Sequence, residues 1–157
     1  MKTSVKAGIV TGQAAGLIMA VVVMLVFTLF LGKSPLHPVQ VIGSTLIGES
    51  ALSGFHFGAL ILGLILHQAG PSLLWGVIYG SVAQKVSITT ASQATFLGVA
   101  IGIISMIGPY LLIPFIMKSL HGTDFWNQEV PIFWDWAAHI VFGASFVLYP
   151  KIYNRIK

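Results

Sequence analysis

Residues 7–32, AGIVTGQAAGLIMAVVVMLVFTLFLG, form a run without a charged side chain. A helix needs about 20 apolar residues to cross the hydrocarbon core of a bilayer, so this run is long enough to span a membrane. Within the run, Gly8, Gly12 and Gly16 recur at steps of four and fall on one helical face. Small residues at this spacing let the backbone of another helix approach closely, which predicts a helix-packing face here.

The composition of the whole chain agrees with the character of this run. Of its 157 residues, 56% are hydrophobic and 8% are charged, and the mean hydropathy is +0.91. Soluble domains have about a quarter of their residues charged, so this composition excludes a large soluble enzyme, a nucleic-acid binder and a disordered chain. The length indicates a single domain over residues 1–157. The absence of cysteine excludes disulfides and thiolate-held cofactors.

Three further apolar runs are long enough to cross a bilayer. We therefore predict an all-α integral membrane protein, a four-helix bundle with spans at about 7–32, 56–83, 94–117 and 131–150. Residues 39–52 are too short and too polar to span. Their apolar side and their polar side, which carries Gln40, Ser44 and Glu49, favour an additional short amphipathic helix at the membrane interface.

The second predicted span has two interpretations, because Gly70-Pro71 interrupts it. Residues 53–84 form either one crossing helix kinked at Pro71, or a helix from Thr45 to His67 followed by a surface helix over 72–83. The single kinked helix is favoured, because the stretch SLLWGVIYGSVA has no polar face to turn toward headgroups. Gly108-Pro109 and Pro114 predict kinks in the third span as well.

The distribution of charge predicts an orientation. Four spans place both termini on one side, which then collects six basic residues against Lys33 and Lys118 on the other side. The positive-inside rule puts that side, and both termini, in the cytoplasm of a multi-pass inner or plasma membrane protein. Trp126, Trp134 and Trp136 fall on the outer side, where an aromatic belt is expected. The six basic residues are Lys2, Lys6, Lys85, Lys151, Arg155 and Lys157.

Two histidines fall inside the predicted spans. At a rise of about 1.5 Å per residue, His67 lies about 16 Å along its helix from His56, and His139 lies about 12 Å from Pro131. We expect both imidazoles at comparable depth, where two facing histidines are the usual axial ligands of a membrane haem b. A metal or quinone site that uses one of these histidines is another interpretation. Hydrogen bonds that fix helix packing are the simplest one.

Asp135 precedes His139 by four residues, so the two side chains share a helical face. This spacing fits a carboxylate that orients a metal ligand, although an ordinary acid at the start of a helix explains it more simply. Other acids and histidines also fall on the outer side, without a tight ligand spacing, and give the hypothesis of an outer-face metal site. The candidate ligands are His56, His121, Asp124 and Asp135.

Five features lie along the chain: the Gly-rich first span, VIGSTLIG, LHQAGPSLLWGVIYG, the Pro-containing third span and AAHIVFGASF. Together they resemble a loose group of uncharacterised small four-helix prokaryotic membrane proteins. In that group a histidine followed by a glycine step recurs in the last helix, here His139 and Gly143. The resemblance implies the four-span layout and close helix packing at Gly143, and it implies no activity.

The sequence lacks a phosphate-binding loop, a nucleophile elbow and a buried carboxylate pair, so we expect no catalytic activity of its own. Long apolar faces favour a non-catalytic accessory subunit of a larger membrane complex, such as a respiratory or metal-dependent oxidoreductase. Its partners would be lipid and other integral membrane subunits, and no nucleic acid. One alternative is a small electron carrier with one haem b between His67 and His139. A second alternative is an outer-face metal-binding membrane protein.

Overall fold

The computed structural model describes all residues from 1 to 157 and is entirely helical. Its fold confirms an all-α chain with four helices that are long and apolar enough to cross a membrane. These helices are Thr3–Leu29, Phe57–Val86, Ala91–His121 and Ile132–Ile156. The apolar runs therefore located the long helices correctly, with differences at their ends.

The second and third long helices are each interrupted by a π-helical turn. The second consists of α3 (Phe57–His67), the turn Gln68–Ser72 and α4 (Leu73–Val86). The third consists of α5 (Ala91–Ser105), the turn Gly108–Leu112 and α6 (Ile113–His121). Each turn contains a Gly-Pro pair, and proline widens a helix because it lacks an N–H and clashes with the preceding turn. Residues 57–86 therefore form one interrupted helix, with no separate surface helix over 72–83.

The first and last long helices differ from the predicted ranges at their ends. The first is α1 (Thr3–Leu29). The last consists of α8 (Ile132–Ala144), a 3₁₀ turn at Ser145–Leu148 and α9 (Tyr149–Ile156). The predicted span ends at Pro150, but the helix continues past it, because this proline lies in the first turn of α9, where its missing N–H costs no helical hydrogen bond.

The connection between α4 and α5 covers residues 87–90 and is shorter than the segment 84–93 between the second and third predicted spans. It is closed by a capping box, in which the Thr90 hydroxyl accepts from the Gln93 backbone N–H at 3.2 Å. The Gln93 side-chain oxygen accepts in return from the Thr90 backbone N–H at 3.2 Å. This reciprocal pair satisfies two backbone donors at the start of α5 and explains why the helix begins at Ala91.

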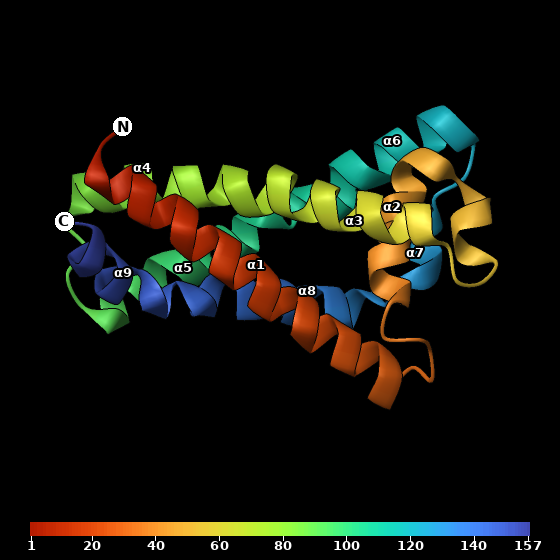
Figure 1. Ribbon diagram of the computed structural model, residues 1–157, viewed down its shortest axis with the longest axis horizontal. Coiled ribbons are helices and arrows are strands. Elements are labelled where there is room, and N and C mark those ends of the chain that lie inside the picture. The colour runs from red at the N-terminus through yellow and green to blue at the C-terminus, as the bar shows by residue number, and fades with distance from the viewer. The chain divides into compact units, whose positions relative to one another are not determined.

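Backbone contacts divide the chain into two compact units. Unit 1 comprises Met1–Met19, Gln68–Ser105 and His139–Lys157, and unit 2 comprises Ala20–His67 and Met106–Ala138. Within unit 1 both termini lie at the same end as the α4–α5 connection (Figure 1).

The core of unit 1 is built around stacked aromatic rings. The ring of Tyr79 in α4 stacks on that of Phe146, with centroids 4.1 Å apart, and Tyr149 tilts against it at 5.0 Å. All three side chains are buried. The Tyr79 hydroxyl donates to the Ala94 carbonyl at 3.1 Å, so its polar end has a partner in the core.

Unit 2 contains the helix that corresponds to the predicted interfacial segment 39–52. It is α2 (His37–Ile47), followed by a 3₁₀ turn at Glu49–Leu52. The helix α2 packs on α3 at glycines: a methyl group added to Gly43 would collide with the Ala59 carbonyl, and one added to Gly63 with the Val39 carbonyl. This helix–helix contact was not predicted.

Three polar side chains of α2 are buried, whereas Glu49 after the helix is exposed, and the interfacial position of this segment stays a prediction. Gln40, Ser44 and Thr45 are all at most 6% exposed. The Gln40 amide donates to the carbonyls of Ala51 (3.0 Å) and Gly54 (2.7 Å). Its oxygen accepts from the His56 backbone N–H at 3.1 Å. Gln40 thus holds the following loop in place, and its burial costs little because it is hydrogen-bonded.

Candidate functional site

His139 and Gly143 of α8 both contact α5 within unit 1. The His139 Nδ1 atom lies 2.6 Å from the Ser105 hydroxyl oxygen, which also donates to the Gly102 carbonyl at 2.6 Å. A hydroxyl has one proton, so a Ser105 that donates to Gly102 accepts from His139, which fits the tautomer protonated at Nδ1. A methyl group added to Gly143 would lie 2.8 Å from the Val99 Cα atom, so the two backbones touch at this point.

His67 is the last residue of α3 and belongs to unit 2, whereas His139 belongs to unit 1. The π-helical turn begins directly after His67. The predicted pairing of these two histidines around a haem b stays a prediction.

The two histidines proposed as outer metal ligands each contact a backbone group of unit 2. The His56 Nδ1 atom accepts from the Ala59 backbone N–H at 3.0 Å, at the start of α3. The His121 Nε2 atom lies 3.2 Å from the Thr45 carbonyl and donates to it. Both contacts fasten helix ends.

The two proposed acidic ligands, also in unit 2, have different partners. The Asp124 carboxylate accepts from the Asn127 backbone N–H at 3.1 Å and caps the short helix α7 (Phe125–Glu129). Asp135 is 7% exposed and accepts from the Trp126 indole N–H at 3.1 Å. No group of three or more His, Asp or Glu side chains lies close enough to hold a metal ion.

The glycines of the first span lie against α4 and the turn before it, all within unit 1. A methyl group added to Gly12 would come 2.7 Å from the Gly76 Cα atom, and one added to Gly8 would come 2.6 Å from the Gly80 Cα atom. At Gly16 it would meet the Gln68 and Ser72 side chains. Backbone therefore meets backbone along this stripe, as small residues at a four-residue spacing allow.

A buried polar group lies at the end of this glycine stripe. The Gln13 side-chain amide donates to the Gln68 carbonyl at 2.9 Å, and this carbonyl belongs to the π-helical turn. The side-chain oxygens of Gln68 and Ser72 are buried and have no hydrogen-bond partner within the protein. A buried oxygen without a hydrogen-bond partner costs folding free energy, so these two oxygens lower the stability of this contact.

A charged cluster that the sequence analysis did not single out lies in unit 2. The Glu129 carboxylate accepts from both the Lys33 ammonium group and the His37 Nε2 atom, the latter at 2.7 Å. Partial burial alone raises the pKa of Glu129, but the hydrogen bonds and charges of Lys33 and His37 outweigh it and lower the pKa below its usual value. The carboxylate thus joins the loop before α2 to α7.

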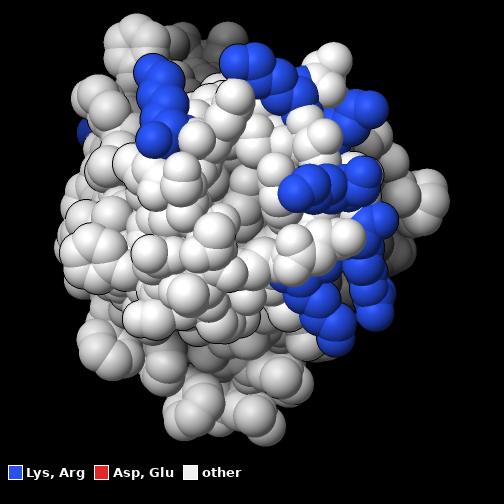
Figure 2. All heavy atoms as spheres, turned by 90° about the vertical axis from the view of Figure 1, so that its left-hand side faces the viewer, with Lys and Arg blue, Asp and Glu red and all other residues white.

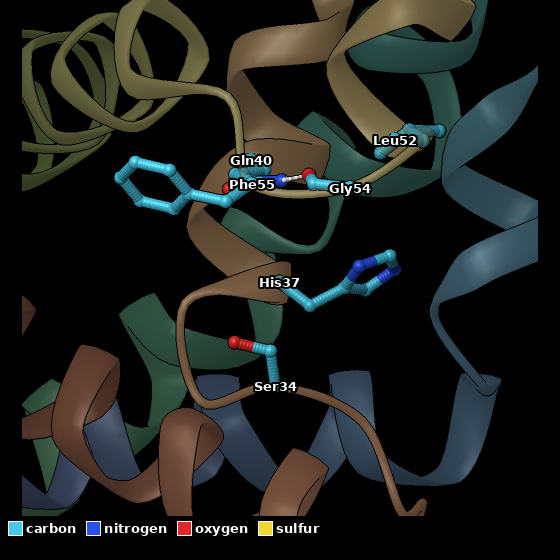
Figure 3. Close-up of a pocket in the computed structure, with 6 residues that line it drawn as sticks. All are labelled: Ser34, His37, Gln40, Leu52, Gly54 and Phe55. Carbon is cyan, nitrogen blue, oxygen red and sulfur yellow. Dashed lines mark hydrogen bonds between the residues drawn. The ribbon is translucent and has the colours of Figure 1, made fainter.

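His37 also lines a small cavity in unit 2 (Figure 3). Figure 3 shows its imidazole between Ser34 on one side and Leu52 and Gly54 on the other, with Gln40 bonded to Gly54. The cavity volume of about 220 Å³ is below the 300–1,000 Å³, roughly, of small-molecule sites. This cavity is therefore too small to enclose a substrate of ordinary size.

Little in the sequence indicates that the residues of this cluster lie together. Lys33 and His37 are four residues apart, but a predicted loop gave no reason to pair them. Glu129 lies 96 residues from Lys33, so only the fold brings them together.

No model of a known protein family, no curated protein and no solved structure matches the chain.

Proposed function

We propose that this protein is a non-catalytic accessory subunit of a larger membrane complex, which it joins by lateral helix packing. The observation that carries the proposal is that the interior polar groups are used to pack helical segments together. His139, Gln13 and Asp135 each hold one helical segment to another within its unit. Catalysis needs such groups to converge on a substrate pocket, and none of these three side chains lines the cavity near His37.

The outward side chains of the long helices support a membrane setting for this role. Large apolar side chains are exposed along them, with Phe96 at 82%, Phe133 at 69% and Phe115 at 66%. Contact between water and so much apolar surface is unfavourable, whereas lipid chains and the apolar faces of other subunits would cover this surface. A respiratory or metal-dependent oxidoreductase is the class of complex that we expect.

Affinity purification in a mild detergent tests the proposal. The tagged full-length chain should co-purify in stoichiometric amounts with larger integral membrane subunits, identified by mass spectrometry. Migration as an isolated monomer after chemical cross-linking in the membrane would contradict the accessory role. An absorbance spectrum provides an independent check, because Soret and α bands that vanish in His67→Ala and His139→Ala would establish an electron carrier instead.

The proposed topology places both termini in the cytoplasm. Because the chain has no cysteine, a single introduced thiol reports the side on which it lies. Asn154 in α9 and Ser53 before α3 are both exposed. In intact cells, a membrane-impermeant maleimide should label Ser53→Cys and leave Asn154→Cys unlabelled. The reverse pattern would overturn the orientation.

A further inference from the structure

The charges of the chain divide between the two units. All four acidic residues belong to unit 2, together with Lys33 and Lys118. Unit 1 contains the other six of the eight basic residues and no acid. The six are Lys2, Lys6, Lys85, Lys151, Arg155 and Lys157.

The six basic residues form one exposed cationic face at the end of unit 1 that carries both termini. They lie in three places: beside the start of α1, near the end of α4, and in α9 together with the residue after it. Each of the six is exposed. Figure 2 shows this face with Lys and Arg side chains spread around it and no Asp or Glu. None of the six takes part in a salt bridge, so their charge is not neutralised within the chain.

Exposed apolar side chains adjoin the cationic face on the same helices. Val10 in α1 is 48% exposed and Val86 at the end of α4 is 56% exposed. The charged side chains therefore lie where an apolar helical surface ends. In a bilayer this is the level of the headgroups, and long basic side chains extend to it with their ammonium or guanidinium groups.

We propose that the cationic face binds the phosphate groups of anionic phospholipids. Six uncompensated positive charges at the boundary of an apolar surface match a lipid leaflet that carries negative charge. A soluble acidic protein would fit a compact basic patch, whereas these cations are distributed over three helix ends, as contacts to several lipid molecules require. This inference does not depend on the accessory role, because lipid binding needs no partner subunit.

Titration of lipid into the purified full-length protein tests the inference. The probes are phosphatidylglycerol and phosphatidylcholine in mixed micelles, with bound lipid counted by native mass spectrometry and stability followed by thermal unfolding. We expect phosphatidylglycerol to bind and to raise the Tm more than phosphatidylcholine does. The difference should shrink at high salt, because the screening length falls to about 3 Å at 1 M salt. Inorganic phosphate at the same concentration should have no such effect.

Charge-removal variants link the effect to the cationic face. Lys151→Gln should weaken phosphatidylglycerol binding about fivefold, which is the contribution of one basic residue near an anionic surface. The triple variant Lys151→Gln, Arg155→Gln and Lys157→Gln should abolish the preference for phosphatidylglycerol. Lys118→Gln, which removes one exposed cation from unit 2, is the matched control and should have no effect.

Three outcomes would overturn the inference. The first is an equal response to the two lipids. The second is a loss of binding in Lys118→Gln as large as that in Lys151→Gln. The third is binding of soluble poly-glutamate without binding of phosphatidylglycerol, which would assign the face to an acidic protein. Unfolding of each variant in phosphatidylcholine alone checks that the fold is intact.

Discussion

The Nδ1 atom of His139 lies 2.6 Å from the hydroxyl oxygen of Ser105, between α8 and α5 of unit 1. Ser105→Ala removes this partner and leaves the shape of the contact almost unchanged. We expect the free energy of unfolding to fall by about 0.6–1.7 kcal/mol, the range measured for hydrogen bonds between membrane helices. Thermal unfolding in detergent measures the change.

Ser145→Ala is a suitable control, because its hydroxyl bonds only to the carbonyl one turn earlier in its own helix. An equal loss in both variants would show that the His139 contact adds nothing.

The contact of Gly12 with Gly76 predicts a strong response to one added methyl group. In Gly12→Ala the new carbon would lie 2.7 Å from the Gly76 Cα atom and force α1 away from α4. Overpacking of this kind costs about 1–3 kcal/mol. In the control Gly70→Ala the new carbon has nothing within 4 Å, so its stability should change much less. A Gly12→Ala variant as stable as the wild type would contradict the close backbone packing.

The lowered pKa of Glu129 predicts how stability depends on pH. Since the carboxyl releases its proton more readily in the folded state than in the unfolded state, its contribution is complete above the unfolded pKa of about 4.3. The contribution is lost as the pH falls through the lower folded value. Glu129→Gln should therefore be less stable than the wild type at neutral pH and lose less stability on acidification. Tm values measured from about pH 7 down to about pH 3 test this against Glu49→Gln, an exposed acid.

The unpaired hydroxyl of Ser72 predicts that substitution of this residue changes stability very little. Its oxygen is buried without a hydrogen-bond partner in the protein, so Ser72→Ala removes no bond and relieves a desolvation cost. We expect unchanged or slightly raised stability. Gln13→Ala, in contrast, removes the donor to the Gln68 carbonyl and should cost about 1 kcal/mol. A marked loss in Ser72→Ala would mean that the hydroxyl has a partner outside the chain, such as a bound water molecule.

Some features of this fold could be predicted because they depend on neighbouring residues. Helix length follows from uninterrupted apolar runs, and the interruptions follow from Pro71 and Pro109, which lack a backbone donor. The glycine stripe of α1 was visible as a spacing, but its partners Gly76 and Gly80 became known only from the fold. Local chemistry determines the long helices and their interruptions, so the sequence pattern was sufficient for those.

Other features depend on contacts between distant segments. Gln40 reads as the polar side of an interfacial helix, yet its partners are backbone groups of Ala51, Gly54 and His56, which no periodicity reveals. The Lys33–Glu129 pair joins residues 96 positions apart. The capping box of Thr90 and Gln93, by comparison, depends on a motif of four consecutive residues, so the sequence alone is enough to indicate it.

The π-helical turn at Gln68–Ser72 accommodates one residue more than a regular turn of helix would. A single added residue shifts everything after it by about 100° around the axis. Within unit 1 the turn thus sets the angle between Gln68, which is bonded to Gln13 of α1, and the glycines of α4 that face Gly8 and Gly12. Deletion of Gly70 would rotate Gly76 and Gly80 away from α1 and turn bulkier side chains of α4 toward it. A helical wheel drawn from Gln68 to Val86 without this turn places Gly76 and Gly80 about 100° from the face that meets α1.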